Sequence, residues 1–271
     1  TLVEAAEEKG MATGIVTTTE LTHATPAVFA SHNASRNGAP EIAVDYLDSG
    51  VDYFAGGGIA YFVPKSFQWS TSKRDDERNL FNEFYKQGYK VFESASKTED
   101  FRNYQPKGKE KVIAAFASGH LPYEVERKQK NDTPSLAELT QKGIDILSKY
   151  DKGFFMMVEG GRIDHACHAQ DIASSIYDTL AFDESIKKAY DFYKKHPSET
   201  LIVVVGDHET GGMGLGFGNN YFLKMNELLD VKVSVEDNLN KAKAYKANGN
   251  REEYFKYLEA NFSLDNLTAA E

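Results

Sequence analysis

Two short segments of the chain combine carboxylate and imidazole side chains directly after strongly apolar runs. The first segment carries Glu159, Asp164 and His168, and the second carries the adjacent pair Asp207 and His208. Such groups are costly to bury unless a cation compensates their charge. The two segments together therefore predict a metal site. For either segment taken alone, a solvated turn with helix-capping acids is the alternative.

The spacing within the first segment indicates which metals fit. Asp164 and His168 are four residues apart, so a helix that starts near Ile163 places both on one face, where they can reach a single ion. Glu159 lies on the strand side of the turn and would point to a neighbouring ion. Carboxylate with imidazole suits zinc, whereas carboxylate with a hydroxyl such as that of Thr25 suits magnesium.

Cys167, the single cysteine, lies between Asp164 and His168. Its thiol could be a third metal ligand, or the residue could simply be a small buried side chain. One cysteine allows no internal disulfide and does not assign a redox compartment.

Strands are expected to position these groups. Residues 154–158 and 201–205 are continuous apolar runs, typical of strands covered on both faces in a parallel sheet. A third strand, residues 14–18, leads to His23 and Thr25. Because ligands of open α/β sheets bind beyond the carboxyl ends of the strands, segments far apart in sequence can meet there.

The composition suits one large α/β core or two modest domains, with 271 residues of which 41% are hydrophobic. The formal net charge of -10 argues against a nucleic-acid partner, but not against an anionic small substrate, because bound cations set the local field of a site. No run approaches the length of a membrane span. We expect an α/β fold with a mostly parallel central sheet flanked by helices.

Other elements follow from periodicity and caps. Residues 117–133 are predicted to be a surface excursion, and Gly56-Gly57-Gly58 a structural turn.

Residues 1–212 are expected to form the main domain, and residues 213–271, rich in Asn, Lys and Glu, a mainly helical appendage or insertion. Further strands are predicted at 51–55 and 112–116, and helices at 1–10, from Pro26 with Thr25 as its cap, at 41–47, at 75–87, from Pro134 to 149 with Thr133 as its cap, and at 169–195.

The motifs resemble those of the alkaline phosphatase family. The resemblance is carried, in the family's order, by His23-Ala-Thr25-Pro26 ahead of Ser35-Arg36, by Glu159-Gly-Gly-Arg-Ile-Asp164-His165 followed by His168, and by Asp207-His208 after a valine-rich run. It implies an α/β sandwich enzyme with two zinc ions and one magnesium ion that hydrolyses phosphate monoesters through a phosphoserine intermediate.

The resemblance also implies a role for each matched residue. Two zinc ions about 4 Å apart can stabilise the attacking and leaving oxygens of an in-line displacement. Arg36 would grip the substrate phosphate with its guanidinium fork. The remaining roles would be Asp164 and His168 on the first zinc, Asp207 and His208 on the second, Glu159 and Thr25 on magnesium, His23 near magnesium through water, and His165 acting on magnesium or phosphate contacts through water.

Some family features have no counterpart in these residues. The family's nucleophilic serine lies upstream of the first helix and strand seen here, and Asp48-Ser49 stands in the wrong order, so we expect it to be a helix-ending turn. No histidine follows His208 to supply the family's late zinc ligand. We therefore expect a fragment of a larger alkaline phosphatase, without phosphatase activity of its own.

For the parent protein, the resemblance implies a phosphate monoester substrate, a possible homodimer, and a periplasmic, cell-surface or secreted location. Two alternatives remain open. One is a phosphodiesterase or sulfatase of the same metal superfamily, against which the set of Thr25, Glu159 and Arg36 argues. The other is a noncatalytic module that binds metal or phosphate.

Overall fold

The computed structural model of the chain describes residues 1–68, 71–212, 228–262 and 264. They fall into two compact units. Unit 1 consists of residues 1–122, 131–161 and 181–203, and unit 2 of residues 123–130, 162–180 and 204–271. Each unit is described by itself.

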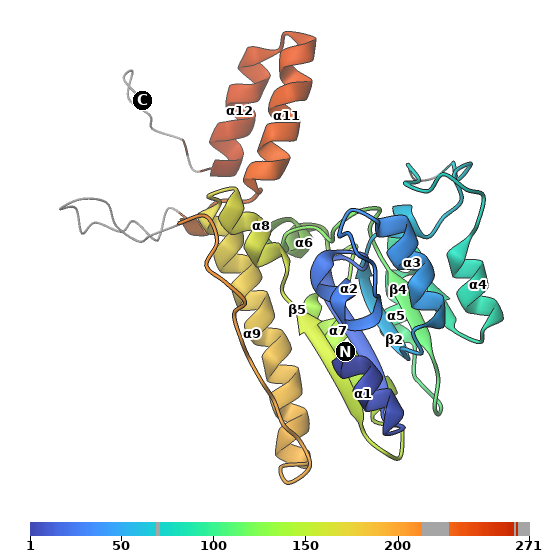
Figure 1. Cartoon of the computed structure of the whole chain (residues 1–271). Helices are drawn as coiled ribbons and strands as arrows, with labels where there is room; N and C mark the ends of the chain where they lie inside the picture. Colours follow the sequence, from blue (N-terminus) through green and yellow to red (C-terminus); the bar gives the residue numbers. More distant parts are fainter. Residues whose placement is uncertain (69–70, 213–227, 263, 265–271) are drawn as a thin grey trace. The chain divides into compact units, whose positions relative to one another are not determined.

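Unit 1 is built on a parallel sheet of five strands in the order β3-β4-β2-β1-β5 (Figure 1). This confirms the predicted α/β fold with a parallel central sheet. In the register between β1 and β5, Thr17 lies opposite Glu159, so both reach the same carboxyl edge. The strands are β1 (Ala12–Glu20), β2 (Tyr53–Gly57), β3 (Lys90–Phe92), β4 (Val112–Ala115) and β5 (Phe154–Glu159).

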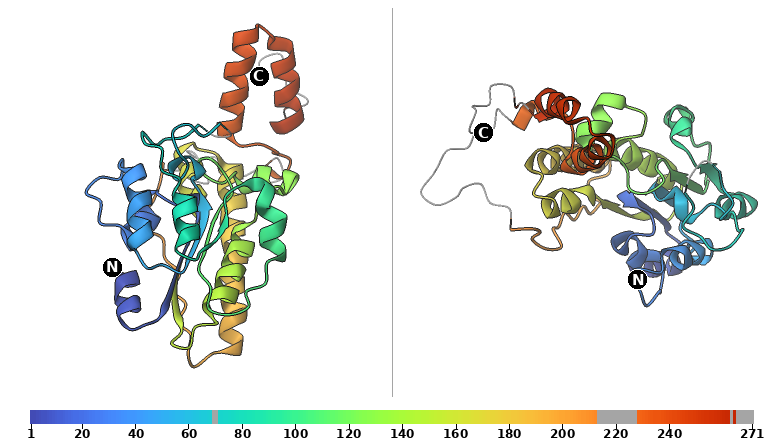
Figure 2. Two further views of the ribbon diagram at one scale, coloured as in Figure 1. Left: turned by 90° about the vertical axis from the view of Figure 1, so that its right-hand side faces the viewer. Right: turned by 90° about the horizontal axis from the view of Figure 1, so that it is seen from above.

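Alternate residues of the strands feed two hydrophobic clusters, as the period of two demands. Ile15 and Phe54 pack in one cluster, whereas their neighbours Val16 and Tyr53 pack in the other. Helices cover both faces of the sheet (Figure 2). The first cluster takes side chains from α1 (Leu2–Glu8), α2 (Ala24–Ala30), α3 (Ala39–Asp48) and α4 (Leu80–Lys86), and the second from α5 (Thr98–Asn103), α7 (Leu136–Leu147) and the later half of α9 (Ile172–Lys195).

Most predicted helices form, but two have N-cap residues other than those expected. The N-cap of α2 is His23 and not Thr25, which lies in the first turn together with Pro26. Proline is tolerated there because the N–H groups of the first turn have no acceptor within the helix. The N-cap of α7 is Ser135 and not Thr133, because Ser135 and Glu138 form a reciprocal capping box that satisfies two backbone N–H groups.

Two further expectations are wrong, and one strand was not predicted. The helix predicted at 75–87 begins only at Leu80, capped by the side chain of Asn79. The predicted surface excursion contains helix α6 (Glu124–Lys130), which buries Val125. The short strand β3 was not predicted, because three residues carry too little pattern to be recognised. The expected turn at Asp48-Ser49 is confirmed, since Ser49 is the C-cap of α3.

The apolar run at 201–205 does not form the predicted strand. In the described part of the chain it pairs with no other strand, and Leu201 and Val205 are 86% and 76% exposed. A hydrophobic run becomes a strand only where a neighbouring strand offers backbone partners and a second layer covers its side chains. Neither condition is met for these residues.

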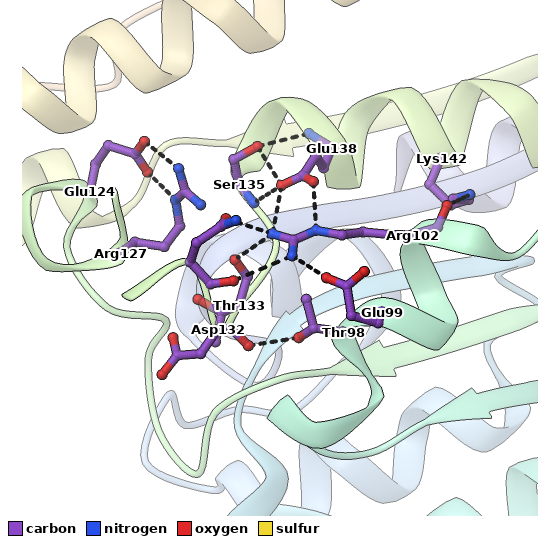
Figure 3. A network of polar contacts seen from close by, with 11 residues as sticks. Thr98, Glu99, Arg102, Glu124, Arg127, Asp132, Thr133, Ser135, Glu138 and Lys142 are labelled. Carbon is purple, nitrogen blue, oxygen red and sulfur yellow. Dashed lines mark hydrogen bonds and ion pairs between the residues drawn. The ribbon is translucent and has the colours of Figure 1, made fainter. Parts of the chain in front are cut away.

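A network around Arg102 ties α5 to the start of α7 within unit 1 (Figure 3). Arg102 donates to Glu138 Oε1 over 2.8 Å, to Glu99 Oε1 over 2.6 Å and to Asn131 Oδ1 over 2.8 Å. Nearby, the buried ammonium of Lys142 donates to the carbonyl oxygens of Arg102 and Tyr104, and burial lowers its pKa. These contacts fix the loop at 131–135 from which α7 starts.

Unit 2 has a small hydrophobic core of Tyr123, Val125 and Ala166, with Tyr177 packed against it. Its helices are α6, α8 (Arg162–His168), the first half of α9, α11 (Val235–Asn248) and α12 (Arg251–Phe262). The last two pair through aromatic rings, for example Tyr245 and Tyr254 with centroids 5.6 Å apart. Residues 213–227, part of the expected appendage, lie outside the described residues. Across the described residues, no helix has both the length and the apolar character needed to cross a bilayer.

Candidate functional site

Glu159 ends β5 and is held by hydroxyl groups at the end of β1. Thr17 Oγ1 donates to Glu159 Oε2 over 2.5 Å, and Thr19 Oγ1 lies 3.4 Å from the same oxygen. The two hydroxyl oxygens are 2.8 Å apart. The predicted carboxylate therefore has a fixed orientation at the carboxyl edge of the sheet, among the oxygen donors that suit magnesium.

Gly161 allows the chain to turn tightly behind Glu159. A Cβ atom at position 161 would lie 2.5 Å from Thr19 Cγ2 and 2.9 Å from Glu159 Cδ. Such distances are below any ordinary contact, so only glycine fits without moving these side chains. Glycine at position 161 thus has a steric reason that involves the candidate metal ligand itself.

The other predicted residues of unit 1 follow β1. Thr25 lies half-buried in the first turn of α2, and among the described contacts no hydrogen bond joins it to Glu159. The His23 ring packs edge-on against that of His120, with centroids 5.7 Å apart, and His120 Nδ1 accepts a hydrogen bond from the backbone N–H of Glu20. Arg36 is exposed in the turn between α2 and α3. His23, Thr25 and Glu159 thus all belong to unit 1, and none of the described contacts joins them in one ligand set.

The predicted zinc residues all belong to unit 2. Asp164 and His168 lie one turn apart on α8, as their spacing predicts, with Asp164 Oδ2 3.7 Å from His168 Nε2. Asp207 and His208 lie in the irregular segment that follows residue 203, with Asp207 Oδ2 3.3 Å from His208 Nε2. Each segment thus presents one carboxylate beside one imidazole.

Thr210 connects these two pairs. Its hydroxyl donates to Asp164 Oδ1 over 2.7 Å and lies 3.1 Å from His208 Nδ1. Because the single hydroxyl proton goes to the carboxylate, the hydroxyl oxygen must accept from His208 Nδ1. Nδ1 of His208 also lies 3.0 Å from the carbonyl oxygen of Glu209, which can only accept. Both contacts place the proton of neutral His208 on Nδ1.

This tautomer leaves a lone pair on His208 Nε2, beside the Asp207 carboxylate. Histidine ligands of metals usually donate their other ring N–H to a carbonyl or carboxylate group in this way. The donor set therefore fits zinc in its chemistry, and the tautomer of His208 leaves its Nε2 able to bind a cation. The geometry is incomplete: in the described part of the chain, no three His, Cys, Asp or Glu side chains converge as a metal cluster.

Cys167 is half-buried on α8, and burial raises the pKa of its thiol. The neutral thiol is therefore favoured, as expected for a small structural side chain. Gly211 lies close by, since a Cβ atom there would be 2.3 Å from the carbonyl oxygen of Cys167. The chain after Thr210 thus passes directly over the end of α8.

Sequence reasoning missed four residues that orient the predicted ligands: Thr17, Thr19, His120 and Thr210. A signal existed for the first two, because three successive threonines at the end of an apolar strand are unusual polar groups for a buried position. His120 carries no local signal, since its loop is distant in sequence from Glu20. For Thr210, the only signal was its position two residues after His208 in the sequence.

Comparison with known proteins identifies the family. The family model of alkaline phosphatase matches residues 1–265. Alkaline phosphatase 3 of Bacillus subtilis is 40% identical over 227 residues, which are 82% of this chain and 45% of that protein. The enzyme of Escherichia coli is 29% identical over 247 residues, 77% of this chain and 51% of its own length. The chain thus spans about half the length of these relatives.

Solved structures agree in fold. The cold-active alkaline phosphatase of the psychrophile Shewanella sp. superposes with a TM-score of 0.81 at 30% identity, covering 99% of this chain and 60% of that one. A histidine-to-glutamate mutant of TAB5 alkaline phosphatase, solved with Mg bound in its M3 site, superposes with a TM-score of 0.59 at 30% identity, covering 72% of this chain and 51% of that one. The chain therefore belongs to the alkaline phosphatase family.

Proposed function

We propose that this chain provides the metal- and phosphate-binding part of a phosphate monoesterase. The observation that carries the proposal is the contact of Thr210 with both Asp164 and His208. The Thr210 hydroxyl orients one candidate ligand from each zinc pair. The resulting tautomer of His208 leaves a lone pair on Nε2, which can bind a cation. A structural turn needs neither property.

The proposed roles follow the donor chemistry of each unit. In unit 2, Asp164 with His168 and Asp207 with His208 would hold two zinc ions. In unit 1, Glu159 and Thr25 would hold magnesium, which prefers oxygen ligands. Bound zinc would supply Lewis-acid stabilisation of the oxygens that exchange at phosphorus.

The remaining residues would position the substrate and its solvent. Arg36 would hold two phosphate oxygens with its guanidinium fork, an interaction that suits a terminal phosphate monoester. His23 and His165 would act through water on the magnesium or phosphate contacts. We infer no nucleophile within these residues, because Ser49 of the Asp48-Ser49 pair caps α3 and lies at the end of that helix.

We further propose that the 271 residues alone turn over phosphate monoesters negligibly. Zinc takes four ligands, and the described residues bring its candidate ligands together only in pairs. The test is hydrolysis of p-nitrophenyl phosphate by the purified chain at alkaline pH with zinc and magnesium present. Robust turnover abolished by a chelator would contradict the inactivity.

Zinc binding is the matched test of the metal role. Calorimetric titration of the chain should show weak binding that His208→Ala reduces about tenfold or more. His196→Ala is the control, because His196 packs against Phe192 at the end of α9 and belongs to neither pair. No zinc binding, or equal loss in both variants, would contradict the proposed function.

A further inference from the structure

Arg162, the first residue of α8, is a buried arginine that belongs to none of the predicted ligand pairs. Its guanidinium is held in three ways within unit 2. Nη1 lies 2.9 Å from His165 Nδ1, and Nη2 donates to Glu236 Oε2 over 2.8 Å. The Cζ atom lies 3.6 Å from the centre of the Tyr123 ring. Together these contacts fix both the position and the plane of the guanidinium.

The contact with His165 determines where that ring carries its proton. A guanidinium offers only donors, since it has no acceptor and does not lose its charge in proteins. His165 Nδ1 must therefore be the acceptor, with its lone pair directed at Arg162. A neutral imidazole that accepts at Nδ1 carries its hydrogen on Nε2. His165 is thus an Nε2–H histidine.

This is the opposite of His208. The carbonyl of Glu209 and the hydroxyl of Thr210 accept from His208 Nδ1, which leaves the lone pair on Nε2. The chain therefore presents two histidines near the candidate zinc carboxylates with opposite chemistry at Nε2. One can bind a cation there, and the other can only donate a hydrogen bond.

We propose that Arg162 is a positioning residue that holds His165 in the Nε2–H form, so that His165 Nε2 is a hydrogen-bond donor for the water-mediated phosphate contact proposed above and not a zinc ligand. The part that concerns zinc and phosphate rests on the proposed function. The tautomer itself does not, because it follows from the contact between the two side chains. His165 follows Asp164 directly, so a donor here also keeps zinc on the neighbouring carboxylate and its partner His168.

Helix α11 is linked to the candidate site through Glu236. Glu236 stands in the first turn of α11, whose N-cap Ser234 is buried. The ion pair with Glu236 holds Arg162 Nη2, whereas His165 contacts Nη1. A residue outside the phosphatase motifs thereby helps to orient a residue within them.

Nitrogen NMR tests the tautomer directly. A two-bond proton–nitrogen correlation spectrum of the ¹⁵N-labelled chain, recorded about two pH units above the ordinary histidine pKa, distinguishes the two neutral forms. The His165 signals are assigned by their loss in His165→Asn. We expect a pyridine-like shift at Nδ1 and a pyrrole-like shift at Nε2. The reverse pattern in the unaltered chain would overturn the proposal without any variant.

Two variants then test the role of Arg162. Arg162→Met should move both nitrogen shifts of His165 toward the average of the two tautomers, whereas Arg162→Lys, which keeps a donor, should restore most of the original pattern. Glu236→Gln should leave the pattern in place, since the glutamine side-chain oxygen can still accept from Arg162 Nη2. An unchanged pattern in a folded Arg162→Met chain would show that Arg162 does not set the tautomer.

Zinc addition separates this inference from the proposed function. We expect ring nitrogens of His168 and His208 to shift on zinc binding, while the shifts of His165 stay in place. A zinc-induced loss of the Nε2–H signal of His165 would overturn the inference. If no histidine responds to zinc, the proposed metal role fails, and the pattern in the metal-free chain still decides whether Arg162 positions His165.

Discussion

Thr210 Oγ1 donates a hydrogen bond to Asp164 Oδ1, 46 positions earlier in the chain, over 2.7 Å. The same oxygen receives the Nδ1–H of His208. This single hydroxyl defines the direction of one carboxylate and the tautomer of one imidazole. It therefore affects both candidate zinc pairs of unit 2 at once.

Replacing Thr210 should weaken zinc binding more than it weakens folding. Thr210→Val keeps the shape of the side chain and removes the hydroxyl, and loss of such an orienting contact typically lowers metal affinity about 10- to 100-fold. Thr210→Ser keeps the hydroxyl and should bind nearly as the original chain does. Calorimetric titration with zinc measures both, and equal affinities for the two variants would show that the hydroxyl orients nothing.

Gly161→Ala should disturb Glu159. The added methyl group would overlap Thr19 Cγ2 and Glu159 Cδ, so we expect a loss of about 1–3 kcal/mol in the free energy of unfolding, the usual cost of overpacking. Gly108→Ala is the matched control, because a methyl group there meets nothing within 4 Å. Denaturant unfolding measures the cost, and if magnesium raises the stability of the original chain, that gain should shrink in Gly161→Ala. A Gly161→Ala chain as stable as the control would contradict the steric argument.

Asp178 should make the stability of unit 2 depend on pH. Burial raises the pKa of this carboxyl from 3.8 to about 7, and the acids Glu124 and Glu126 add to the rise, while the backbone N–H of Glu124 and the charge of Arg162 oppose it. The folded chain therefore holds a proton that the unfolded chain releases above about pH 4. Stability should fall as the pH rises from about 4 to 7, by up to the order of 4 kcal/mol.

Asp178→Asn removes this dependence while keeping an oxygen that can accept from the backbone N–H of Glu124, a bond of 3.1 Å. Its free energy of unfolding should be flatter over this interval and higher than that of the original chain near pH 8. Asp183→Asn, an exposed change on the same helix, should leave the curve unchanged. Greater stability of the original chain at pH 8 would refute the assignment.

The Arg102 network should contribute more than an ordinary surface ion pair. Arg102→Met leaves the half-buried Glu138 without its cation, and we expect a loss of about 2–3 kcal/mol in the free energy of unfolding. Lys97→Met removes an exposed pair with Asp100 and should cost less than about 1 kcal/mol. Urea unfolding compares the two, and equal losses would mean that the network adds nothing beyond a surface contact.

The sheet and the positions of the main candidate ligands on their elements could be predicted because their signals are local. The apolar run that became β5 ends directly at Glu159, and the four-residue spacing of Asp164 and His168 is sufficient to place them on one face of α8. Both depend only on the period of the backbone. The position of each residue at its strand or helix end follows from the sequence alone.

The orientation of these residues could not be predicted, because it depends on contacts between distant segments. The sequence near His165 does not indicate that Arg162 also binds Glu236, which lies 74 positions later in the chain. The run at 201–205 shows the opposite failure, since its composition is that of a buried strand but its backbone has no partner among the described residues. The local sequence pattern indicates which secondary structure a segment can form, whereas strand pairing depends on the segments that lie beside it.

The position of β5 at the end of the strand order has a consequence for assembly. Its only neighbour in the described sheet is β1, so its other side offers a row of backbone N–H and C=O groups to an incoming chain. A strand that joined there in parallel would end beside Glu159, because the carboxyl ends of parallel strands share one edge. A strand added at this edge would therefore bring its last side chains to the candidate magnesium carboxylate.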